Sequence, residues 1–188
     1  MHRLIAALVA ATLLAILSSH LLDAQQRDAE PFAAEGIPAV PLPDPPVEYR
    51  TADGQGIRVS VVTTGLTYPW GLAFLPDGRV LVTERLGALR VIREGALDPS
   101  PLSGVPEVFT GTALAGLMDV AVHPEFSDNR WVYLTYSKPT DAGSTVALAR
   151  GRLDGHVLSE VRDIFVSDAD GAAAGASRLL FAPDGTLY

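Results

Sequence analysis

Short runs of apolar residues alternate with glycine, proline and aspartate along most of the chain, and this pattern predicts β-strands joined by tight turns. Seven runs rich in aliphatic and β-branched residues are predicted as strands: residues 57–62, 71–74, 80–83, 89–92, 120–122, 131–136 and 147–153. Beyond residue 24, no window shows the 3.6-residue apolar period of an amphipathic helix. We therefore expect this part of the chain to be almost entirely β.

Three segments repeat one pattern, in which an apolar strand is followed by a proline, an acidic residue and a second apolar strand. The segments are residues 71–82, 119–134 and 178–188. Proline fixes φ at the turn and Asp-Gly tolerates a positive φ, so the pattern predicts a β-hairpin in each segment.

The prolines of the three turns, Pro76, Pro124 and Pro183, are 48 and 59 residues apart. A four-stranded propeller blade takes roughly 40–50 residues. This spacing favours an all-β fold of partial β-propeller type, with about two complete blades and the start of a third. A β-sandwich is the structural alternative, but it does not explain a hairpin repeated at blade spacing. Propellers close with about 4–8 blades, so we expect a truncated N-terminal portion of a longer protein.

The N-terminus has the pattern of a secretory signal peptide. Arg3 provides the basic start, Leu4–Leu22 is almost wholly apolar, and Ala24 is a small residue suited to cleavage. We therefore expect residues 1–24 to be a helical signal peptide and the rest to be periplasmic or secreted. An uncleaved membrane anchor is the alternative, and it is the only route to membrane contact that the pattern offers.

A proline-rich segment follows the expected signal. Six prolines lie from Pro31 to Pro46. They bias the backbone towards extended conformations, and each lacks the backbone N–H that could donate a hydrogen bond. We expect residues 25–56 to be a disordered linker and residues 57–188 to form the folded domain.

The composition limits which partners and which redox groups the chain can use. The 188 residues contain 14 Lys and Arg against 22 Asp and Glu, a formal net charge of −8, with no basic cluster. Nucleic acid is therefore excluded as an expected partner, because affinity for phosphate backbones depends on clustered Lys and Arg. The chain has no Cys, so disulfides, thiolate metal sites and iron–sulfur clusters are excluded. Any redox chemistry needs a non-covalent organic cofactor or a metal held by oxygen and nitrogen.

Five motifs keep the order and spacing seen in one known family. They are Tyr68–Gly78, Leu81–Arg85, Gly104–Val108, Gly116–Phe126 and Ser177–Gly185. On these motifs, residues 57–188 resemble the soluble sugar dehydrogenases that depend on pyrroloquinoline quinone (PQQ), also called the glucose/sorbosone dehydrogenase family. The resemblance implies a six-bladed propeller, export to the periplasm, and PQQ bound with calcium at one end of the central channel. It also implies a small sugar as substrate, oxidised at its C1 hydroxyl by hydride transfer to the quinone.

The chain departs from the family pattern at the site itself. The family's catalytic His stands four residues before the arginine that matches Arg178, and here that position is Ala174, with Ala173 before it. Alanine cannot accept the proton of a sugar hydroxyl. The family's cofactor-contacting Gln is Leu114 here. The sequence therefore assigns no catalytic, cofactor-binding or metal-binding residue to this chain.

Three explanations of these departures remain open. The chain has lost the quinone and binds something else, it belongs to a subgroup that uses other polar residues, or a shifted loop brings another group to the cleft. Asp168 and Asp170 are carboxylates near the altered loop, but acids beside glycine mostly serve turns. The leading function is an exported sugar dehydrogenase-like protein, and the alternative is a catalytically silent propeller that acts as a binding protein or scaffold.

Other conspicuous residues are predicted to be structural. His123 lies in a repeated hairpin turn, where capping or packing is favoured. The run Thr83-Glu84-Arg85 follows a strand, a position where acid–base pairs join blades. Trp70 and Trp131 flank strands and are expected to pack rather than to bind sugar.

Overall fold

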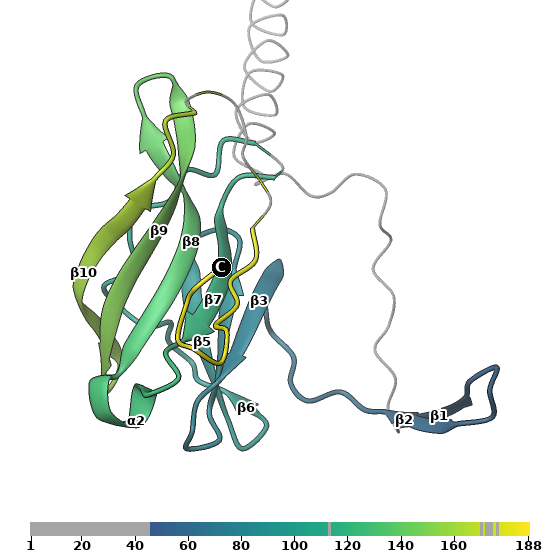
Figure 1. Ribbon diagram of the computed structural model, residues 1–188. Helices are drawn as coiled ribbons and strands as arrows, with labels where there is room; N and C mark the ends of the chain where they lie inside the picture. The colour runs from purple at the N-terminus through teal and green to yellow at the C-terminus, as the bar shows by residue number, and fades with distance from the viewer. Residues whose placement is uncertain (1–45, 113, 170, 172–174, 176) are drawn as a thin grey trace, which may run out of the picture. The chain divides into compact units, whose positions relative to one another are not determined.

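The computed structural model describes residues 46–112, 114–169, 171, 175 and 177–188 (Figure 1). All of them belong to one compact unit, Pro38–Tyr188. The other unit, Met1–Ile37, includes the expected signal peptide and lies outside the described residues. Within the described ranges, no helix is both long and apolar enough to cross a membrane.

The described chain forms three antiparallel sheets. A two-stranded sheet pairs β1 (Val47–Arg50) with β2 (Gly56–Val59). The first four-stranded sheet consists of β3 (Pro69–Phe74), β4 (Val80–Glu84), β5 (Ala88–Arg93) and β6 (Ala96–Leu97). The second four-stranded sheet consists of β7 (Leu117–Val122), β8 (Trp131–Thr140), β9 (Gly143–Asp154) and β10 (Val157–Val166). One four-residue helix, α2 (Phe126–Asn129), joins β7 to β8 in this part of the chain. The all-β expectation is confirmed, whereas the blade count and the signal helix stay predictions.

The three expected hairpins are all present. β3 pairs with β4, β7 pairs with β8, and a bridge joins Phe181 to Leu187 in the third segment. The first and third turns use the same device, because the Asp77 carboxylate accepts the backbone N–H of Arg79 and the Asp184 carboxylate that of Thr186. The hydrogen bond from the Arg79 guanidinium, and then that from the Arg79 N–H, hold the pKa of Asp77 below its usual value, and the Thr186 N–H does the same for Asp184. The repeated sequence pattern thus produces a repeated local structure.

Three strands were not expected from the pattern. β1 lies inside the range expected as linker, the two-residue β6 ends the first sheet, and β10 follows β9 at the edge of the second sheet. Leu158 is the only buried residue of β10, and two register shifts interrupt its pairing with β9. An edge strand with charged residues and bulges lacks the apolar alternation by which strands are recognised.

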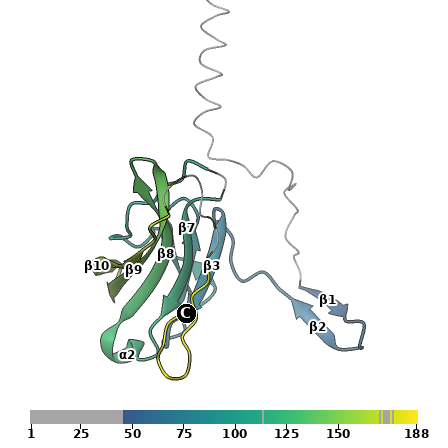
Figure 2. The ribbon, with the colours of Figure 1, turned by 45° about the horizontal axis from the view of Figure 1, so that its top comes forward.

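The main core lies between the two four-stranded sheets. Leu81, Leu89 and Val91 of the first sheet are buried together with Leu117 and Leu134 of the second. Both ribbon views show β3 beside β7, the first strand of each sheet (Figure 2). Each fully buried leucine contributes about 1.5–3 kcal/mol relative to an exposed one, so this interface holds the two sheets together.

Two buried threonine hydroxyls connect successive repeats. Thr83 Oγ1 accepts the N–H of Gly71, 2.9 Å away in its own sheet, and donates to the carbonyl of Met118 in the second sheet at 2.5 Å. Thr135 Oγ1 accepts the N–H of Asp119 at 3.0 Å and bonds Ser177 Oγ, which precedes the third hairpin, at 2.5 Å. Both β3 and β7 are bulged near these contacts, so the hydroxyls satisfy backbone groups that ladder pairing leaves free.

The second sheet also contains a partly buried polar network. The Tyr136 side chain is 3% exposed, and its hydroxyl donates to Asp163 at 2.8 Å. Lys138 Nζ donates to the other oxygen of Asp163 at 2.6 Å. Burial, and then the hydrogen bond to the Asp163 carboxylate, raise the pKa of Tyr136 well above its ordinary value.

We expect Tyr136 to be the last tyrosine of the chain to ionise. Above roughly pH 10, the ordinary tyrosine pKa, the unfolded chain loses this proton while the folded chain keeps it. The folded state then binds more protons, so the free energy of unfolding falls as the pH rises. Absorbance of tyrosinate and urea unfolding at about pH 9 to 11 measure both effects. Tyr136→Phe should remove this part of the pH dependence, whereas Tyr49→Phe, at an exposed position, should leave it unchanged.

Candidate functional site

Two segments that carry the altered family positions lie side by side. Leu114 precedes β7, and Gly175 directly follows position 174, which itself lies outside the described residues together with Ala173. A Cβ built at Gly175 would overlap the Cβ of Leu114 and come within 2.5 Å of its carbonyl oxygen. The structure therefore packs Leu114 against Gly175.

Arg85 holds the segment that carries Leu114. The guanidinium is buried at 5% exposure, and its Nη1 donates to the carbonyls of Thr112 and Ala115, each at 3.1 Å. The carbonyl of Arg85 accepts the N–H of Leu117 at 2.9 Å. These bonds fix both ends of the segment, while the Leu114 side chain between them is 58% exposed.

The Arg85 contact depends on a glycine. Gly116 has φ of 154° and passes so close to the Arg85 carbonyl that any Cβ there would overlap it. The Arg85 guanidinium also lies 5.3 Å from the centre of the Tyr68 ring, a cation–π distance. The side chain is thus packed on one side and hydrogen-bonded on the other.

Asp119 makes the corresponding contacts to the third hairpin. Its carboxylate is 3% exposed, and its two oxygens accept from different donors. Oδ1 accepts from Arg178 Nη1 at 3.2 Å, and Oδ2 accepts the N–H of Leu179 at 2.8 Å. A buried carboxylate satisfied by one charged and one backbone donor joins the second sheet firmly to this segment.

Gly71 makes room for the Asp119 carboxylate. A Cβ at Gly71 would lie 2.5 Å from Asp119 Oδ1 and 3.3 Å from the Met118 carbonyl. Gly71, Asp119 and Arg178 occupy the same position in the three repeated segments, and the structure places them next to one another. The pair of Asp119 and Arg178 is the charged feature that sequence reasoning missed. The sequence does contain a signal for this pair, because an acid and a base stand at equivalent positions of the second and third repeated segments.

The described residues do not fit a quinone or calcium site. Leu114 offers no polar side-chain atom at the position where the family resemblance implies a cofactor contact. In the ranges that the structure covers, no group of three or more His, Asp or Glu side chains could hold a metal ion. We therefore derive no catalytic step through PQQ or calcium for these residues.

The residues expected to be structural have structural contacts. His123 Nδ1 accepts the N–H of Glu125 at 3.0 Å and lies 2.8 Å from Asn129 Nδ2, and its ring packs on Phe181. Glu84 accepts the N–H of Thr67 at 2.5 Å and pairs with Arg90. The His123 contacts agree with the predicted packing role. Glu84 bonds within the first sheet and its lead-in, whereas Thr83 and Arg85 make the contacts that reach the second sheet and the segment before it.

The remaining candidates are not drawn into the cleft. Trp131 lies under Arg150, whose guanidinium is 3.9 Å from the ring centre, so it packs as expected. Trp70 lines an apolar hollow of about 510 Å³ on the outer face of the first sheet. Asp168 is exposed, in agreement with a turn residue, and Asp170 lies outside the described residues.

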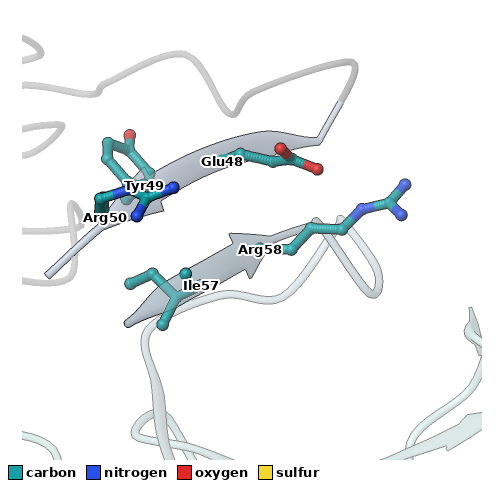
Figure 3. Close-up of a pocket in the computed structure, with 6 residues that line it drawn as sticks. Glu48, Tyr49, Arg50, Ile57 and Arg58 are labelled. Atoms are coloured by element: carbon teal, nitrogen blue, oxygen red, sulfur yellow. The ribbon is translucent and has the colours of Figure 1, made fainter. Parts of the chain in front are cut away.

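A second hollow lies on the two-stranded sheet, and its lining residues are far in sequence from Leu114 and Gly175. It has a volume of about 420 Å³ and is lined by residues of β1 and β2, among them the cross-strand pairs Glu48 with Arg58 and Tyr49 with Ile57 (Figure 3). None of its lining residues belongs to a family motif or to the cleft segments. We therefore assign the candidate site to the neighbouring segments 112–116 and 175–179.

Known proteins match the part of the chain that contains the candidate site. A family model described as glucose/sorbosone dehydrogenase matches residues 66–188. An uncharacterized protein from Synechocystis sp. is 38% identical over 169 residues, which cover 85% of this chain and 41% of that protein. Aldose sugar dehydrogenase YliI from Escherichia coli is 41% identical over 109 residues, which cover 57% of this chain and 29% of that protein.

A solved structure agrees with these matches. The PQQ-bound form of aldose sugar dehydrogenase from Streptomyces coelicolor superposes with a TM-score of 0.59 at 27% identity. The superposition covers 69% of this chain and 39% of that chain. The chain thus spans less than half the length of each of these relatives.

We expect Gly71→Ala to lower the free energy of unfolding by about 1–3 kcal/mol, because the new methyl group must displace the buried Asp119 carboxylate. Urea unfolding measures the change. Gly56→Ala is the matched control, since Gly56 lies in a strand, has no positive φ and has no atom within 4 Å of a built Cβ. Equal effects of the two substitutions would contradict the close packing of Gly71 against Asp119.

Proposed function

Because the chain belongs to the glucose/sorbosone dehydrogenase family, we propose that it is part of an exported sugar dehydrogenase-like β-propeller. An active enzyme of this kind would oxidise the C1 hydroxyl of an aldose, and the general base and the groups that hold PQQ and calcium would have to come from residues other than those described above. The observation that carries the proposal is the match over residues 66–188. The aldose sugar dehydrogenases among the relatives support a sugar as the substrate class.

The preserved scaffold around the cleft also supports this assignment. Arg85 and Asp119 hold the two cleft segments in fixed positions, although the side chains at positions 114 and 174 are apolar. The segments are therefore positioned as a binding site requires. Export is supported by the pattern of residues 1–24, and the number of blades by the spacing of the repeated hairpins.

A catalytically silent propeller that binds a ligand or a partner is the second candidate function. The observation that favours it is the loss of polar groups at two cleft positions, where Leu114 and Ala174 replace the Gln and His that the resemblance implies. Without an imidazole at position 174, the chain supplies no general base there. The base would have to come from another part of the protein.

Dye-linked oxidation of several aldoses by the full-length protein, supplied with PQQ and calcium, distinguishes the two functions. The dehydrogenase proposal predicts turnover that is abolished when PQQ is omitted. Absence of both turnover and PQQ retention would reject that proposal and leave the silent propeller. The measurement needs no variant, so it does not depend on a substitution being tolerated.

We expect Ala174→His combined with Leu114→Gln to raise kcat by roughly 10²- to 10⁴-fold, the contribution of a positioned general base. The gain should follow an ionisation near neutral pH, because the new base is an imidazole. Ala173→His combined with Leu114→Met is the matched control, since it adds the same imidazole one residue away and keeps position 114 apolar. A similar gain in the control would contradict the assignment of position 174.

A further inference from the structure

We propose that Asp119 is a positioning residue for the candidate site: it holds residues 177–179 in place as Arg85 holds the carbonyls of Thr112 and Ala115. The proposal rests on the proposed function only in assigning these residues to the candidate site. Asp119 is buried, and its carboxylate has two donors.

Three hydrogen bonds from the second sheet reach consecutive residues in the described part of this segment. Thr135 bonds Ser177, and the two oxygens of Asp119 bond Arg178 and Leu179. Burying a carboxylate without partners is costly. Asp119 therefore favours the register in which Arg178 and Leu179 both lie against its carboxylate.

The backbone contact carries more of this effect than the ion pair. The side chain of Arg178 is 80% exposed, whereas that of Asp119 is 4% exposed. Solvent screens a guanidinium in such a position, and exposed ion pairs contribute little. The Leu179 N–H, at 2.8 Å from Oδ2, is the contact at which the positioning role should be measured.

Amide hydrogen exchange in the full chain, measured by NMR, tests the proposal. Asp119→Ala should speed exchange of the Leu179 amide by about tenfold or more relative to the Leu117 amide, because a hydrogen bond to a charged acceptor is lost. Asp119→Asn keeps one acceptor oxygen and should give a smaller change. The Leu117 amide is the internal reference, since it bonds the Arg85 carbonyl.

Two control variants complete the experiment. Arg178→Gln should leave Leu179 exchange within about twofold, because the exposed ion pair contributes little. Asp77→Asn, in an exposed turn, should also leave it unchanged. Parallel acceleration of Leu179 and Leu117 in Asp119→Ala, or no acceleration of either, would overturn the proposal. The readout does not involve sugar oxidation, so an inactive protein with the expected exchange pattern would reject the proposed function and keep this positioning role.

Discussion

The hydroxyl group of a buried threonine, repeated in each four-stranded sheet, is the interaction on which the arrangement of this structure depends. Thr83 and Thr135 each bind the bulge in the first strand of their own sheet and also reach the segment that begins the next repeat. Apolar contacts between sheets are not directional and tolerate sliding. A hydroxyl that bonds a backbone group of its own sheet and a group of the next repeat favours one register, so it determines how successive repeats align.

This alignment also explains why the candidate site lies between repeats. The segment before β7 carries Leu114, and Gly175, in the segment before the third hairpin, packs against it. Arg85 holds the first segment through two carbonyls, and Asp119 holds the second through Arg178 and Leu179. Chemical function and scaffold are therefore separable here, because the positioning contacts are present although Leu114 and Ala174 lack the groups that oxidation requires.

Much of the fold was predictable because its determinants are local. Proline at the turn, with Asp77-Gly78 or Asp184-Gly185 after it, specifies a hairpin without reference to the rest of the chain. The strand β10 was not predictable, since an edge strand with bulges carries no clear apolar period. Leu114 was found through resemblance alone. The pair of Asp119 and Arg178 was missed because it joins residues 59 apart in sequence, and only folding brings them together.

The free energy of unfolding of Thr83→Val tests the central role of the threonine hydroxyls most directly. Valine keeps the shape of threonine but leaves the Gly71 N–H and the Met118 carbonyl without this partner in the interior. The account predicts a loss of about 1–3 kcal/mol in urea unfolding, the cost of leaving buried polar groups unsatisfied. Thr64→Val, at an exposed position, is expected to change the free energy by less than about 0.5 kcal/mol. A Thr83→Val protein as stable as the Thr64→Val protein would contradict the account.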